Sequence, residues 1–488
     1  MPGEGPTNGG AALHTADASL AEWMDRQYRL SAAAMLQSIS AVDLVKRRPG
    51  FGQIIRPAKG SVLASPVIAA YDPDPDYFFH WLRDSAVVID AVRTLIEDGA
   101  DDPGLLDYVK DFIRFSLALG DLDGRALVAS GAAGQAPDPK FQQYMRPSHE
   151  LSEAFGDRIS GETRFNPDGT LDVTKWARPQ HDGPALRALA MLRFWPMPVL
   201  DDGETRGAAR RLIEVDLAFT HQHWREPSFD IWEEESGHHY YTRLVQHAAL
   251  ADGAQWLEEM GDAQRAHAYR TASREIAGEL EGHWDAAKGF YLSRIGVAAG
   301  SAEKELDIAV ILAVIHARRQ DGRHSVFDPK VQASQARLEH LFADAYPINR
   351  ALPGDRSAAM GRYQGDVYYS GGAYYFSTLA AAEFFFSLAD ALARRAETNG
   401  LSPGDLSSIE ALVAAEQELD GSGAFDALLK RGDSFMATVR AYTPASGELS
   451  EQFDRTTGQQ TSAKNLAWSH AAFITAVAAR RAACRSRD

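Results

Sequence analysis

The sequence contains almost no cysteine: Cys484 is the only one among 488 residues. One thiol cannot form a disulfide within the chain, so the fold must be stabilised by its hydrophobic core. Long apolar runs are also missing, because no stretch approaches the ~18 uninterrupted apolar residues that a membrane-spanning helix needs. Near its start the chain shows no basic segment followed by an apolar run, and we expect no membrane anchor.

Positive charge is scarce relative to negative charge. The chain has 50 lysine and arginine residues against 67 aspartate and glutamate residues, which gives a formal net charge of −17. Nucleic acids and anionic membranes would be repelled, so neither is an expected partner, whereas a neutral ligand remains compatible. The hydrophobic fraction of 45% is typical of an ordinary globular protein.

Apolar residues recur mostly with helical spacing, as Leu186, Leu189 and Ala190 do at positions i, i+3 and i+4. Residues 1–17, which begin with MPGEGPTNGG, are expected to form a flexible leader, and residues 483–488 a tail. Between them, residues 18–482 should form a single domain. The pattern predicts twelve helices, centred near residues 30, 90, 113, 188, 213, 248, 270, 311, 336, 383, 412 and 472.

Long segments rich in glycine, proline and aromatic residues separate several of these helices, at about 140–181, 224–239, 346–371 and 441–462. Loops of this length in a compact domain usually carry function. Twelve helices with long loops at alternate connections predict an all-α fold, an (α/α)6 barrel. In it, six inner helices lie inside six outer ones, and the long loops form a pocket at one rim.

Two of these loops contain clustered carboxylates. In residues 229–237 (FDIWEEESG), Glu233 follows Trp232. A carboxyl that packs against an indole and beside other carboxyls is favoured in its protonated form, as a general acid requires. The cluster is equally explained as the acidic start of a helix, which the helix dipole favours.

Glu451 lies in the second cluster, residues 449–454 (LSEQFD). A glycosidase needs two carboxyl groups on opposite sides of the scissile bond. One protonates the leaving oxygen, and the other activates water or attacks the sugar. Taken alone, the segment also fits a solvated acidic turn or a cap of the last helix.

Residues 77–84 (YFFHWLRD) and 176–184 (WARPQHDGP) combine aromatic rings with arginine and aspartate. Aromatic faces stack on sugar C–H groups, while Arg and Asp side chains fix hydroxyl groups. The same residues could instead be a structural ion pair and core indoles. The close histidine pairs at 221 and 223 and at 238 and 239 lack the spacing of a metal-ligand motif, so we expect no metal and no cofactor.

Together the motifs resemble the catalytic domain of the glucoamylases, glycoside hydrolase family fifteen, from about residue 20 to residue 481. Chance agreement of so many ordered motifs is negligible. The resemblance implies an exo-acting, inverting α-glucoside hydrolase that releases β-D-glucose from the non-reducing ends of malto-oligosaccharides and starch-type α-glucans. The motifs are YFFHWLRDS, KWARPQHDGPALRA, FDIWEEESG, VQHAAL, GRYQGDVYYSGGAYYFSTLAAAE, AYTPASGELSEQF and TSAKNLAWSHAA.

The resemblance also implies roles for single residues. Glu233 matches the family's general acid and Glu451 its general base, so Glu233 should carry the proton and Glu451 the negative charge. Inverting enzymes hold these two groups about 6.5–9.5 Å apart to leave room for water. The residues expected to bind substrate or to support the two carboxyls are Tyr77, Trp81, Arg83, Asp84, Trp176, Arg178, Asp182, Ile231, Trp232, Glu234, Arg362, Tyr374, Ser462 and Trp468.

Two short segments depart from the family pattern. Gln364-Gly365 stands where Pro-Glu follows Gly-Arg-Tyr, and Gly372-Ala373-Tyr374 stands for the Asn-Pro-Trp of the fungal enzymes. Because these positions are expected to face the sugars beyond the cleaved bond, an α-1,6-glucohydrolase for isomaltose or dextran and a trehalose-cleaving enzyme stay open as alternatives. A sugar-binding pseudoenzyme is the alternative from another class.

The expected partner is an α-glucan or oligosaccharide substrate. We expect a monomer that is secreted or periplasmic, with its signal peptide removed. The lone cysteine would also suit a cytoplasmic protein, so that location stays open.

Overall fold

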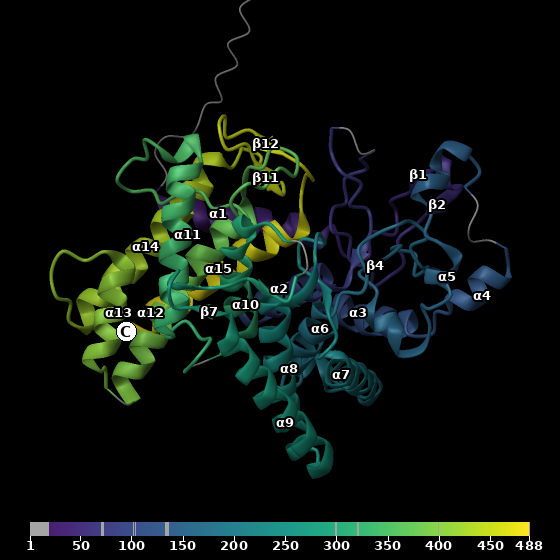
Figure 1. Cartoon of the computed structure of the whole chain (residues 1–488), viewed down its shortest axis with the longest axis horizontal. Helices are drawn as coiled ribbons and strands as arrows, with labels where there is room; N and C mark the ends of the chain where they lie inside the picture. Colours follow the sequence, from purple (N-terminus) through teal and green to yellow (C-terminus); the bar gives the residue numbers. More distant parts are fainter. Residues whose placement is uncertain are drawn as a thin grey trace, which may run out of the picture.

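The computed structural model describes residues 19–69, 73–100, 102, 104–131, 136–297, 300–319, 322–398 and 400–487. Within these ranges, six helices form a closed inner ring, in which each helix contacts the next and the last contacts the first (Figure 1). In ring order they are α2 (Leu82–Glu97), α6 (Asp182–Phe194), α8 (Tyr240–Glu259), α10 (Ala309–Ala317), α12 (Tyr375–Thr398) and α15 (Ala467–Arg487).

Six further helices of the described chain pack outside this ring, each against an inner helix. This is the predicted (α/α)6 barrel, and every one of the twelve predicted helix centres lies within a helix. The outer helices are α1 (Leu20–Leu36), α3 (Gly104–Leu119), α7 (Gly203–His223), α9 (Ala263–Leu280), α11 (Pro329–Ala345) and α14 (Gly421–Tyr442). They contact α15, α2, α6, α8, α10 and α12, respectively.

The prediction missed α14, the outer partner of α12. The centre predicted near residue 412 belongs instead to α13 (Pro403–Val413), an additional helix that contacts α11 and α14. Glycine is a poor helix former, and α14 contains Gly421, Gly423 and Gly432. Tertiary packing overrides this preference, since the absence of a side chain at Gly432 lets α14 lie directly on the ring of Phe386. Two short helices, α4 (Gly124–Ala129) and α5 (Ser148–Leu151), lie outside the ring.

α12 is apolar on most of its surface. By length and composition it could cross a membrane, but 78% of its most apolar 18-residue window is buried inside the protein. It contacts α10, α14 and α15. Its apolar surface therefore forms part of the barrel core.

Short strands connect the loops at one rim of the barrel. β3 ends where α2 begins, β6 where α8 begins, and β10 where α12 begins. Antiparallel pairing thus fixes the loops at the N-terminal ends of the inner helices. The sheets at this rim are β3 (His80–Trp81) with β4 (Arg164–Phe165), β6 (Ser236–His239) between β5 (Ser228–Phe229) and β9 (Arg294–Ile295), and β11 (Gln452–Phe453) between β10 (Ala373–Tyr374) and β12 (Gln460–Thr461). Two other hairpins are β1 (Lys46–Arg48) with β2 (Gln53–Ile55), and β7 (Trp284–Asp285) with β8 (Phe290–Tyr291).

The C-terminal boundary differs from the expected one at residue 482. α15 continues to Arg487, because Ala483 is buried and Arg487 pairs with Asp426 of α14. The expected leader, residues 1–17, lies outside the described residues.

We expect Gly432→Ala to destabilise the barrel, although alanine is the better helix former. An added Cβ would lie 2.3 Å from a ring carbon of the buried Phe386, and such overpacking costs about 1–3 kcal/mol. Gly278→Ala is the matched control, because the site on α9 is exposed and no atom lies within 4 Å of an added Cβ. That variant should gain up to about 1 kcal/mol. Urea unfolding measures both, and equal gains in the two variants would contradict the close packing of α14.

Candidate active site

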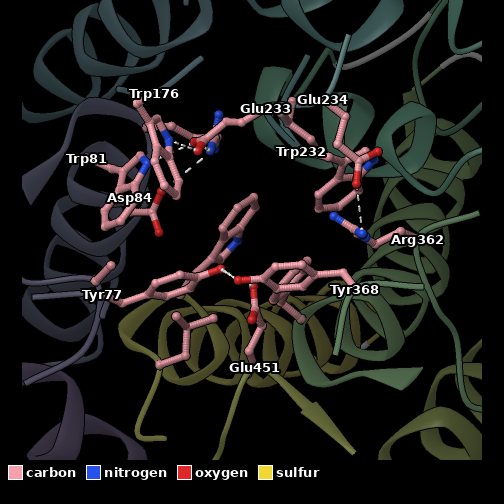
Figure 2. A pocket seen from close by; sticks show the side chains of 16 residues that line it. Tyr77, Trp81, Asp84, Trp176, Trp232, Glu233, Glu234, Arg362, Tyr368 and Glu451 are labelled. Carbon is pink, nitrogen blue, oxygen red and sulfur yellow. Dashed lines mark hydrogen bonds and ion pairs between the residues drawn. The ribbon is translucent and has the colours of Figure 1, made fainter. Parts of the chain in front are cut away.

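The loops at the N-terminal ends of the inner helices enclose a cavity of about 250 Å³ (Figure 2). This is slightly below the ~300–1,000 Å³ of typical ligand pockets, so it suits a small ligand or one end of a larger one. The cavity combines aromatic rings with four carboxyl groups and two guanidinium groups. It is lined by Ala64, Tyr77, Trp81, Arg83, Asp84, Trp176, Ile231, Trp232, Glu233, Glu234, Arg362, Tyr368, Phe376, Glu451, Leu466 and Trp468.

Twelve of the sixteen predicted site residues line this cavity. The other four, Arg178, Asp182, Tyr374 and Ser462, are not among its lining residues. Four lining residues were missing from the prediction. Two of these, Tyr368 and Phe376, belong to the motif GRYQGDVYYSGGAYYFSTLAAAE, while Ala64 and Leu466 are apolar residues without a chemical signal.

Glu233 lies on a tight turn between β5 and β6. Its φ of 65° is in the left-handed region, which residues other than glycine adopt uncommonly. Asp230 stabilises this turn: its carbonyl accepts from the Glu233 amide at 3.0 Å, and its carboxylate accepts from the next two amides at 2.8 and 2.9 Å. The strained backbone therefore directs the Glu233 side chain into the cavity, as Figure 2 shows.

Three N–H groups donate to the Glu233 carboxyl. Trp81 Nε1 and Arg83 Nη2 donate to Oε1 at 2.8 and 3.0 Å, and Trp176 Nε1 donates to Oε2. Trp81 precedes α2, and Trp176 lies in the loop before α6. Elements distant in sequence thus hold this carboxyl in one orientation.

Arg83 is a buried cation shared by several acceptors. Besides Glu233, it donates to Asp182 at 3.0 Å and to Gln180 at 3.2 Å, while Asp84 lies 3.7 Å away. Asp182 therefore supports the site through Arg83, from behind the cavity wall. Burial raises the pKa of Asp84 to about 6, although the charge of Arg83 acts in the opposite direction.

Glu234 belongs to a second charged group on the same wall. It pairs with Arg362 at 3.0 Å and with Lys304 at 2.6 Å, and Lys304 also pairs with the buried Asp230 at 2.7 Å. Arg362 in turn donates to Asp366 at 2.7 Å. No sequence motif indicated Lys304, which nevertheless connects the turn of Glu233, through Glu234, to the guanidinium of Arg362.

Glu451 lies on the wall opposite Glu233 (Figure 2) and directly precedes β11. Ser462 donates to one of its oxygens and Tyr77 to the other, the latter at 3.3 Å. The Tyr77 hydroxyl also lies 2.8 Å from that of Tyr368. Ser462 therefore lies behind the carboxyl and orients it.

Burial raises the pKa of Glu451 to about 7. The donors Ser462 and Tyr77 and the charge of Arg362 lower this pKa, whereas the nearby Asp84 raises it further. We expected Glu451 to be the readily ionised partner, and the direction of this shift is the opposite. Loss of solvation in the closed pocket outweighs the hydrogen bonds that favour the carboxylate.

An aromatic stack forms the floor of the cavity. The rings of Phe376 and Trp468 are nearly parallel, with centroids 4.5 Å apart, and Trp232 lies 6.1 Å from Phe376 on the other side. Trp232 donates to the buried Asp307 at 2.8 Å, which fixes the angle of its indole. The pocket is therefore closed at the end that faces the barrel core.

Tyr374, at one of the two departures from the family pattern, does not contact the cavity. It is buried, donates to Asp366 at 3.3 Å and accepts from Gln452 at 2.7 Å. Arg178 is partly buried and pairs with Glu162 and Asp172. Both positions support the site instead of forming its surface. Throughout the described ranges, no group of three or more His, Cys, Asp or Glu residues is arranged to hold a metal ion.

The model of the glycosyl hydrolases family 15 matches residues 49–116 and 129–478 of the sequence. These ranges include every residue of the cavity lining. The chain belongs to this family. It is a glycoside hydrolase.

Known members of the family resemble the chain over most of its length. Glucoamylase 1 of Rhizopus oryzae is 28% identical over 488 residues, which cover 96% of this chain and 72% of that protein. Glucoamylase-1 of Schizophyllum commune is 30% identical over 440 residues, which cover 87% and 69%. The structure of Hormoconis resinae glucoamylase superposes with a TM-score of 0.75 at 26% identity, covering 95% of this chain and 74% of that one.

Removal of the Lys304 charge should destabilise the protein strongly. Lys304→Met leaves the buried Asp230 without its cation, and breaking a buried ion pair from one side costs about 3 kcal/mol or more. Lys288→Met is the control, because this exposed lysine also pairs with two carboxylates, Asp285 and Glu305. It should change the urea unfolding midpoint very little. Similar losses in both variants would show that the buried pair of Lys304 and Asp230 contributes no more to stability than an exposed pair.

Proposed function

We propose that this glycoside hydrolase removes single β-D-glucose units from the non-reducing ends of malto-oligosaccharides and starch-type α-glucans, with inversion at the anomeric carbon. The observation that carries the proposal is the presence of Glu233 and Glu451 on opposite walls of one closed pocket. Two carboxyls facing each other across a sugar are the minimum that glycosidic hydrolysis requires. The glucoamylases that resemble this chain support the choice of substrate.

In this mechanism Glu233 is the general acid. Its turn places the carboxyl at the mouth side of the cavity, beside the half-exposed Trp176, where the oxygen of the cleaved bond would lie. Glu451 is the general base, and it would take a proton from the water that attacks the opposite face of the sugar. Ser462 and Tyr77 orient this carboxyl, so that its position does not depend on the substrate.

The charged groups on either side would bind the hydroxyls of the terminal glucose. Asp84 and the guanidinium groups of Arg83 and Arg362 line the cavity, and Trp232 gives it an aromatic wall. Interactions that tighten as the ring flattens toward the transition state accelerate the reaction, whereas uniform binding does not. Because Phe376 and Trp468 close the floor, only a chain end can enter, which favours exo action.

We further propose that the enzyme acts as a monomer outside the cytoplasm, as a secreted or periplasmic protein. Starch-type polymers do not cross membranes, so an enzyme that degrades them has to meet them outside. Size-exclusion chromatography coupled to light scattering measures the mass in solution, and a monomer should give the 53.3 kDa of one chain.

Glu233→Gln and Glu451→Gln should each lower kcat by about 10²- to 10⁴-fold, since each removes a proton-transfer group. Proton NMR during hydrolysis of maltose, isomaltose and trehalose measures the rate and the anomer released first. We expect β-glucose first, and maltose to be the fastest of the three. Initial release of α-glucose would contradict inversion, and faster turnover of isomaltose or trehalose would favour the α-1,6-specific or trehalose-cleaving alternative.

The pH dependence follows from the raised pKa of Glu451. A base must be ionised, so kcat/KM should fall as the pH drops below about 7, by close to tenfold per pH unit. Ser462→Ala removes a hydrogen bond that lowers this pKa, so the acidic limb of the profile should move to higher pH. Ser450→Ala is the control, because that hydroxyl donates to the Gln452 carbonyl and not to Glu451. An acidic limb unmoved by Ser462→Ala would argue against Glu451 as the base.

A further inference from the structure

Arg164 is a buried arginine beneath the wall of the pocket, and it does not line the cavity itself. It lies on β4, directly opposite Trp81 of β3 in the antiparallel register. Its Cζ lies 3.5 Å from the ring centroid of Trp176, 4.0 Å from that of Phe79 and 5.0 Å from that of Trp81. One guanidinium thus contacts both indoles that donate to Glu233.

The guanidinium is itself fixed from behind. Its Nε donates to Asp172 at 2.9 Å and its Nη2 to Thr174 at 3.2 Å. Asp172 is completely buried and also pairs with Arg178. These bonds hold the plane of Arg164 against rotation, so its flat face remains available to the aromatic rings.

Trp176 depends on this contact more than Trp81 does. The Trp176 residue is 39% exposed at the mouth of the pocket, while Trp81 is 4% exposed. An indole with so much free surface has few neighbours to fix its orientation. The stacked cation beneath it, its bond to Glu233 and an edge contact with the Trp81 ring set the direction of its N–H group.

We propose that Arg164 is a positioning residue for proton donation. It stacks on the indoles of Trp81 and Trp176 so that their N–H groups hold the Glu233 carboxyl toward the leaving oxygen. A lysine would keep the charge and the pairing with Asp172, but it has no planar face to stack on an indole. This inference rests on the proposed role of Glu233 as general acid.

The test compares two substrates that differ in their need for a proton. The glucose cleaved from maltose leaves as an alcohol, so its oxygen requires protonation, whereas the fluoride of α-D-glucosyl fluoride departs with little help from an acid. Arg164→Lys removes the flat guanidinium from the two indoles, so it should lower kcat on maltose by about tenfold and on the fluoride by less than about threefold. Equal losses on both substrates, or no loss on maltose, would overturn the proposal.

Arg146→Lys is the matched control, because Arg146 is a buried arginine of the same region. It pairs with Glu162, which also binds Arg178, but it stacks on no ring in the described structure. This variant should change kcat on neither substrate by more than about twofold. If Arg164→Lys does not fold, Trp176→Phe keeps a ring on the guanidinium but removes the N–H group, and it should show the same loss confined to maltose.

Glu233→Gln separates this proposal from the mechanism on which it rests. If Glu233 is the acid, that variant loses maltose hydrolysis and keeps most turnover of the fluoride. Equal loss of both would show that the acid is assigned wrongly, whatever the Arg164 variant does. Loss confined to maltose in Glu233→Gln together with equal losses in Arg164→Lys would leave the mechanism intact and refute the positioning role alone.

Discussion

The pocket depends on the pairing of the carboxyl groups that line it with cations or with N–H and O–H donors. Burial alone would drive Asp84 and Glu451 toward their neutral forms, and close approach of like charges adds to this. Arg83 pairs with Asp84 and Glu233, and Arg362 pairs with Glu234. Glu451 has only hydroxyl donors in direct contact, and burial raises its pKa to about 7.

The charged groups of the pocket are positioned by the N-terminal ends of the inner helices and the loops that precede them. The cavity forms where the N-terminal ends of the inner helices meet, and short strands directly precede three of these helices, α2, α8 and α12. Asp84 and Asp182 lie in the first turns of α2 and α6, and Asp307 accepts from the first amide of α10. Helix N-termini favour negative charge, so the arrangement that builds the pocket also helps to keep carboxylates in it.

Much of this architecture could be predicted from the sequence. The 3.6-residue spacing of apolar residues located twelve helices, because each helix hides one face in the core. The spacing did not locate α14. There the close packing of Gly432 on Phe386 stabilises the helix, and this contact between distant residues leaves no pattern in the local sequence. The motifs likewise located the walls of the site. They could not separate lining residues from the supports behind them, such as Asp182 and Ser462, because that distinction depends on how the chain folds over each position.

The raised pKa of Glu451 is a clearer example of a property that the sequence alone does not predict. Its sequence neighbours favour an ordinary acidic residue in a polar loop, yet its burial depends on Tyr77, Tyr368 and Ser462, which come from three different loops. Lys304 is another such case, because its two carboxylate partners lie 70 or more residues away in the chain. The raised pKa of Glu451 and the ion pairs of Lys304 therefore arise only when the folded chain brings these distant residues together.

Closure of the inner ring also determines when the enzyme can first work. The wall that carries Glu233 is complete early in the chain, but Glu451 and Trp468 come from its last forty residues, and α15 closes the ring between α12 and α2. A chain still emerging from the ribosome therefore has the proposed proton donor, Glu233, without the proposed base, Glu451. In the proposed mechanism, hydrolysis therefore requires that α15 has been made and has closed the ring, and a chain that stops before Glu451 would lack the base.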